Sequence, residues 1–156
     1  MVAVVIAGCS HARSPARPVV VAPPAPPPPP PKLVVLLAES DRFPELARAT
    51  TETLLAAKVA GLATAKESNV SLEVVQLSIE CVDPSTACYQ AVGKSLAADG
   101  LLFAQITSVK KRQLKVTISL FDVDEKTLKT KAERVFPSEA AAAAGLADLV
   151  AEATKP

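Results

Sequence analysis

The hydrophobic pattern divides the chain into a proline-rich front and a longer part in which apolar residues recur at strand and helix spacing. The patterned part begins at Leu33, where five apolar residues stand in a row. Such a short continuous run is typical of a strand that is covered on both faces. The patterned part is about 124 residues long, which is an ordinary size for one domain with its own core.

The clearest strand signal lies after residue 113. Leu114, Val116, Ile118 and Leu120 alternate with polar residues, which is the two-residue period of a strand with one buried face. The apolar pattern predicts further strands over 33–37, 70–79, 101–109 and 128–136.

Helix signals separate these strands. Ser40 and Asp41 can cap a helix that carries Pro44 in its first turn and runs to about residue 66. Asp83 followed by Pro84 predicts the start of a second helix, which Asp99 and Gly100 end. Ser138 is the expected cap of a last, alanine-rich helix with Leu146, Leu149, Val150 and Ala153 on one face.

The expected order is therefore β-α-β-α-β-β-β-α. It predicts an α+β or α/β fold, with a mixed sheet of about five strands and helices packed on at least one face. An unpaired edge of this sheet could pair two copies, but the sequence does not indicate which edge is open.

Residues 10–32 are expected to form a disordered linker. They hold ten prolines, six of them consecutive from Pro26 to Pro31, and proline has a fixed φ and no backbone donor. An extended polyproline spacer of this length would reach about 70 Å. The predicted organisation is a partial signal segment over 1–9, the proline-rich linker over 10–32 and an α/β domain over 33–156.

The residues before the linker resemble the lipobox of bacterial lipoproteins. Ile6 is apolar, Ala7 and Gly8 are small, and Cys9 follows. In that family the cysteine is acylated and the preceding peptide is removed, so the resemblance implies that Cys9 is a lipidation site. A secretory signal opens with cationic residues and has a longer apolar core. We therefore expect the natural start to lie upstream of Met1.

Cys81 and Cys88 are the two cysteines of the predicted domain. In an oxidising compartment this pair predicts a disulfide, and closing its 8-residue loop would contribute about 2–3 kcal/mol. Six intervening residues do not fit the spacing of a redox motif, and two thiols without histidine make a poor zinc site. Two free buried thiols are the alternative that the sequence leaves open.

The sequence predicts no catalytic, metal or cofactor site. His11 is the only histidine and lies in the linker, so no histidine-dependent nucleophile can form in the domain. No glycine-rich phosphate loop is present. The carboxylates of Asp122, Asp124 and Glu125 fall in a predicted turn, where Asp is favoured for backbone reasons. Residues 110–112 are expected to form a second, solvated turn.

Charge and composition argue against some partners. The formal net charge is +1, with basic residues scattered along the chain, and aromatic residues make up 3%. A nucleic-acid partner needs a basic patch, so we expect none. The longest apolar run, Met1 to Gly8, is far shorter than the ~20 residues of a membrane helix.

Two short motifs resemble the α/β domain at the amino end of TolB and of related envelope lipoproteins. In that family a helix ends in Leu-Ala-Ala-Asp before an apolar strand, as at 96–99, and a hairpin strand closes in Leu-Phe-Asp, as at 120–122. The family strand often continues into a glycine, where this chain has Gln105 and Ile106. The resemblance implies a non-catalytic envelope domain that binds other proteins.

The sequence therefore predicts a lipid-anchored periplasmic interaction or assembly module, on the outer membrane, whose partners are envelope proteins of unknown identity. The membrane contact would be through the lipid anchor only, with no small-molecule substrate. The sheet edge and the loop 83–89 are possible docking surfaces. One alternative is a cytosolic or exported adaptor recognised through its proline-rich tract. Another is a small hydrolase or thiol enzyme without histidine, using Cys88 or Asp122.

Overall fold

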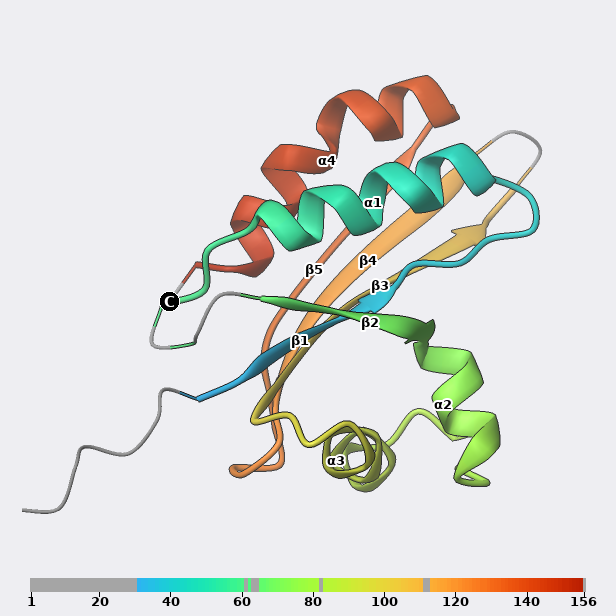
Figure 1. Ribbon diagram of the computed structural model, residues 1–156. Helices are drawn as coiled ribbons and strands as arrows, with labels where there is room; N and C mark the ends of the chain where they lie inside the picture. The colour runs from blue at the N-terminus through green and yellow to red at the C-terminus, as the bar shows by residue number, and fades with distance from the viewer. Residues whose placement is uncertain (1–30, 61, 63–64, 82, 111–112, 156) are drawn as a thin grey trace, which may run out of the picture.

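The structure, a computed structural model, describes residues 31–155 except 61, 63–64, 82 and 111–112. It contains a five-stranded sheet with two helices on each face (Figure 1). The strands are β1 (Leu33–Leu37), β2 (Lys66–Ser71), β3 (Gly100–Ser108), β4 (Leu114–Asp122) and β5 (Thr127–Phe136). The helices are α1 (Pro44–Ala56), α2 (Leu72–Ser78), α3 (Thr86–Ser95) and α4 (Glu139–Ala153).

The sheet is mixed, and its strands lie in the order β2-β1-β3-β4-β5. β1 pairs in parallel with β2 and β3, whereas β3, β4 and β5 form an antiparallel meander. The β3–β4 register runs without a break from Gly100 opposite Asp122 to Ser108 opposite Leu114. This confirms the expected fold class and the mixed sheet of five strands.

Two apolar clusters hold the helices to the sheet. The first, on the side of α1 and α4, includes Leu54, Val116 and Leu149, and all three side chains are fully buried. The second, on the side of α2 and α3, includes Val92, Leu101 and Phe121. Figure 1 shows α1 and α4 side by side above the sheet and α2 and α3 below it. The burial of large side chains on both faces explains why the central strand β3 begins as a continuous apolar run.

The strand predicted over 70–79 is wrong in most of its length. β2 ends at Ser71, and residues 72–78 form the helix α2. The Ser71 hydroxyl accepts a hydrogen bond from the Val74 amide and caps this helix. Leu72, Val75 and Gln76 are buried at helical spacing, so the change of parity at Val74 marks a helix and not a bulge.

The first two predicted helices correspond to α1 and α3, and both are shorter in the structure than predicted. α1 ends at Ala56 and not near residue 66, because β2 is parallel to β1 and the chain must return to the start of the sheet before Lys66 pairs with Val34. α1 begins at Pro44, and its N-cap is Phe43 and not the predicted Ser40 or Asp41. No side chain caps the helix, and the Ser40 hydroxyl accepts instead from the Phe43 amide just before it. The cap of α3 is Ser85, two residues after the expected Asp83.

The predictions for the strand after residue 113 and for the last helix agree with the structure. β4 is the predicted strand, with Leu114, Val116, Ile118 and Leu120 buried on one face. Its other face is buried as well at Thr117, Ser119 and Phe121, so the strand is covered on both sides and not on one. Ser138 caps α4 by accepting a hydrogen bond from the Ala141 amide. The expected apolar face of this helix is buried against the sheet. Among the described residues, no helix has both the length and the apolar character needed to cross a membrane.

Candidate functional site

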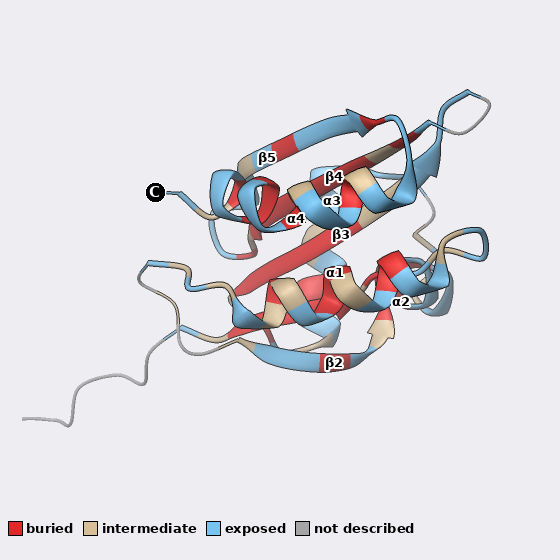
Figure 2. Cartoon of the chain, turned by 90° about the horizontal axis from the view of Figure 1, so that it is seen from above, coloured by how far each residue is buried: buried red, intermediate tan, exposed pale blue. Residues whose placement is uncertain are grey.

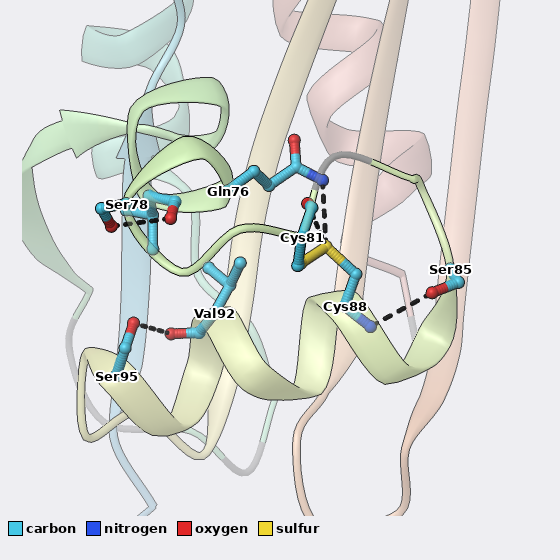
Figure 3. Close-up of a disulfide and its surroundings, with 8 residues drawn as sticks. Gln76, Ser78, Cys81, Ser85, Cys88, Val92 and Ser95 are labelled. Carbon is cyan, nitrogen blue, oxygen red and sulfur yellow. Dashed lines mark hydrogen bonds between the residues drawn. A yellow bond between two sulfur atoms is a disulfide. The ribbon is translucent and has the colours of Figure 1, made fainter.

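The disulfide between Cys81 and Cys88 joins the end of α2 to the first turn of α3 (Figure 3). The two Cα atoms are 5.6 Å apart. Cys88 is buried, and Cys81 is half-buried at the surface. Because Cys88 is bonded to Cys81, it offers no thiolate nucleophile, which removes its candidate role in a thiol enzyme.

Local backbone geometry brings the two cysteines together. Glu80 has a φ of 55°, and the Cys81 amide donates back to the Gln76 carbonyl over 2.8 Å. These are the marks of a Schellman end to α2, which reverses the chain immediately before Cys81. On the other side, the Ser85 hydroxyl accepts from the Cys88 amide and fixes the start of α3. The disulfide therefore closes a loop whose two ends are already held by helix caps.

Gln76 completes this environment. Its side-chain amide nitrogen lies 3.3 Å from the Cys88 sulfur and donates toward it. Gln76 is buried, with 9% of its surface exposed. The Cys81 carbonyl oxygen is 2.8 Å from the same sulfur. This second contact is packing and not a hydrogen bond, since a disulfide sulfur has no proton to donate. The sequence pattern gave no signal for Gln76, because the segment was assigned to a strand.

A second cluster fastens the start of the domain, and we call it the tether clasp: Lys32, Leu96, Ala97, Asp99 and Gly100. The Lys32 ammonium donates to the Leu96 and Ala97 carbonyls over 3.1 and 3.0 Å. The Lys32 amide donates to the Asp99 carboxylate, and the Lys32 carbonyl accepts from the Asp99 and Gly100 amides. Lys32, which the sequence assigned to the linker, is thus bonded to the domain through both its backbone and its side chain.

The clasp explains the first motif that resembles the TolB domain. Ala97 has a φ of 50°, and the Ala98 amide donates to the Gly93 carbonyl, so residues 96–98 form a Schellman end to α3. The Lys32 ammonium lies at the carboxyl end of this helix, where a cation is favoured by the exposed carbonyls. The motif therefore has a structural role, which is to end α3 and to attach the chain that precedes β1.

The second motif lies beside the first. Asp122 at the end of β4 pairs with Gly100, and the Val123 amide donates to the Asp99 carbonyl. The Asp122 carboxylate accepts from the Glu125 amide over 2.8 Å and so holds the β4–β5 turn. Residues 96–99 and 120–122 meet at the end of the sheet from which the chain leaves toward its amino terminus.

Two of the turn carboxylates, Asp122 and Glu125, form ion pairs with one lysine. The Lys129 ammonium bonds the Glu125 carboxylate and lies 3.7 Å from Asp122. The hydrogen bond with Glu125 raises the pKa of Lys129. A cavity of about 500 Å³ adjoins the turn, and its wall includes Pro31, Leu62, Asp99, Asp122 and Lys129. The described contacts of the Asp122 carboxylate, with the turn amide and with Lys129, are those of a residue that holds a turn.

The predicted lipidation site lies outside the described part of the chain, as do two other features noted in the sequence. Cys9 and His11 precede residue 31, and two residues of the turn 110–112 are also outside. Within the described ranges, no group of three or more His, Cys, Asp or Glu residues is placed to hold a metal ion.

No model of a known protein family matches the chain, and no curated protein sequence matches it. Several solved structures are similar. The LpoB C-terminal domain from Salmonella enterica is 12% identical, with 69% of this chain and 83% of that chain covered and a TM-score of 0.44. PelC from Paraburkholderia phytofirmans, solved as a dodecamer, is 16% identical, with 81% and 89% covered and a TM-score of 0.43.

A third similar structure is TolB from Acinetobacter baumannii. It is 18% identical, and the match covers 81% of this chain and 29% of that chain with a TM-score of 0.44. This chain therefore spans less than a third of that TolB. TolB is also the family that the two sequence motifs resemble.

Proposed function

We propose that this protein is a lipid-anchored module of the bacterial envelope that acts by binding other envelope proteins and catalyses no reaction. Cys9 would carry the lipid, residues 10–31 would form the spacer, and the α/β domain would be the part that partners recognise. The Cys81–Cys88 disulfide is the observation that carries the proposal. A disulfide in a small domain is stable in the oxidising periplasm and rare in the cytosol.

The tether clasp supports the same proposal. A fixed junction would set the point on the domain from which the spacer leaves. Lys32 provides such a junction, because its ammonium and its backbone bond the end of α3 and the start of β3. The absence of a free thiol at Cys88 and the structural role of Asp122 leave binding as the better supported role.

The test is a comparison of cysteine variants of the full chain, expressed in a bacterium behind a complete secretion signal. Cells are fed an alkyne-bearing fatty acid and then fractionated. We expect the wild-type protein to be labelled and to sediment with the membranes. Cys9→Ser should be unlabelled and soluble, because no other thiol stands at a lipobox-like sequence.

Cys88→Ser is the matched control, since it removes one cysteine from the domain and leaves Cys9 intact. It should be labelled as strongly as the wild type. A wild-type protein that is soluble and unlabelled would contradict the anchor and with it the proposal.

A further inference from the structure

The outer edge of the sheet at β5 is open. β5 is the last strand in the order β2-β1-β3-β4-β5, and its described residues pair with β4 only. In an antiparallel pair, alternate residues direct their backbone N–H and C=O groups away from the partner strand. Figure 2 shows β5 at the rim of the molecule, largely exposed and with no element beyond it. This edge therefore presents a row of backbone groups that another strand can bind.

The two faces of β5 differ in what their side chains do. On the side of α4, Thr130 donates to the Ala153 carbonyl, and Arg134 lies 3.1 Å from the Glu152 carboxylate. On the opposite side, Lys131 and Glu133 are exposed and lie 3.0 Å from each other. Their neighbours across β4 are the uncharged Ser119 and Thr117. The pair with Lys131, and after it the charge of Lys115 diagonally across on β4, lowers the pKa of Glu133. Neither Lys131 nor Glu133 has an opposite charge directly across from it on β4.

The sequence of β5 is complementary to itself in one antiparallel register. If two copies of β5 pair about a two-fold axis at Ala132, Lys131 of each copy lies opposite Glu133 of the other. Opposite charges that face each other across a sheet stabilise the pairing, and like charges oppose it. The axis residue is an alanine, so no bulky side chain crosses the axis.

The other open edge lacks this property. β2 reads Lys66-Glu67-Ser68-Asn69-Val70-Ser71. A two-fold axis at Ser68 places Glu67 opposite an uncharged asparagine, and an axis at Glu67 places two carboxylates opposite each other. β2 is also shorter, with 6 residues against 10 in β5.

We infer that the protein forms a two-fold symmetric dimer in which the β5 strands of two copies pair antiparallel about Ala132, with Lys131 facing Glu133 across the axis. The two sheets become one continuous sheet of ten strands, and the interface is isologous, as in most homodimers. The inference concerns the domain and does not depend on the anchor. A soluble protein that dimerises in this way would refute the anchor alone.

Charge reversal tests the register. The full chain is studied by sedimentation velocity from about 1 µM to about 1 mM, a range that detects dissociation constants of ordinary homodimers. We expect the wild-type protein to sediment at twice its chain mass of 16.2 kDa. Lys131→Glu should raise the dissociation constant about tenfold or more, because two attractive pairs become repulsive. Glu133→Lys should do the same.

Mixing the two variants is the decisive step. At positions 131 and 133, the Lys131→Glu variant carries two carboxylates and the Glu133→Lys variant carries two ammonium groups. Every pair across the axis of a mixed dimer is therefore attractive again. We expect the mixture to form a heterodimer with an affinity near that of the wild type. Its formation would also prove that both variants are folded.

Lys66→Glu is the control on the other edge strand, and it should leave the dimer unchanged. Backbone hydrogen exchange within 130–134 should slow as the wild-type concentration rises. A wild-type protein that stays monomeric over the whole range overturns the inference. So does a dimer that Lys131→Glu leaves intact, or a mixture that forms no heterodimer.

Discussion

Two adjacent threonines of α1, Thr50 and Thr51, are both buried but make different hydrogen bonds. The Thr50 hydroxyl donates to the Leu46 carbonyl over 2.7 Å, within its own helix. The Thr51 hydroxyl donates to the Ala47 carbonyl of the same helix. It also accepts a hydrogen bond, over 2.9 Å, from the Ala38 amide in the segment that follows β1. Only the bond with Ala38 satisfies a backbone donor that lies outside the helix.

Thr51→Val should therefore cost more stability than Thr50→Val. The first leaves the buried Ala38 amide without a partner, at a cost of about 1–3 kcal/mol. In the second, the Leu46 carbonyl loses one of two possible donors and the hydroxyl itself is removed, so the cost is smaller. Urea unfolding of the two full-length variants measures the difference, and equal losses would contradict this account of Thr51.

The hydroxyl of Tyr89 makes the stability of the fold depend on pH. Its ring packs on Phe103 and Phe121, with centroids 5.1 and 5.6 Å away. Burial raises the pKa of its hydroxyl above the ordinary value of 10.0, and the charge of Lys131 opposes this shift. The folded state therefore holds the proton to a higher pH than the unfolded state does, so stability falls as pH rises above about 10.

Tyr89→Phe keeps the ring and removes this titration. Between pH 9 and pH 11, the urea midpoint of the variant should fall less than that of the wild type. Identical alkaline losses in the two proteins would show that the hydroxyl does not contribute.

At the scale of elements, the disulfide holds α2 against α3. Reducing it frees an 8-residue loop in the unfolded chain, which should lower the free energy of unfolding by about 2.5 kcal/mol. Urea unfolding with and without a reductant measures this loss. The double variant Cys81→Ala and Cys88→Ala should be insensitive to the reductant, and a wild type that is equally insensitive would contradict the bond.

The strands and helices differ in how clearly the sequence predicts them. β4 was predictable because one of its faces packs on helices throughout, so Leu114 to Leu120 alternate strictly. The segment 70–79 was not, because a strand of six residues is followed directly by a helix of seven, and each is too short for its period to dominate. Ser71 was the available signal, since its hydroxyl caps α2.

In the candidate site, too, some contacts could be predicted from the sequence and others could not. The spacing of Cys81 and Cys88 predicted their bond, because only a local reversal is needed to bring them together. The contacts of Lys32 with Leu96 and Ala97 were not predictable from spacing, since 64 and 65 residues separate the partners. The one hint was a lone cation between a run of prolines and a buried strand.

At the scale of the whole molecule, we propose that an anchor, a spacer and a binding domain are joined in one chain. The described part supplies the disulfide and the junction at Lys32. The lipid on Cys9 is the proposal on which the cellular role depends, because it would place the domain at a membrane surface.

The intact mass of the protein purified from its native membranes, measured with and without reductant, tests this claim most directly. We predict a mass that begins at an acylated Cys9 and rises by about 2 Da on reduction, as two sulfurs regain their hydrogens. An unprocessed chain whose mass does not change on reduction would contradict the envelope assignment.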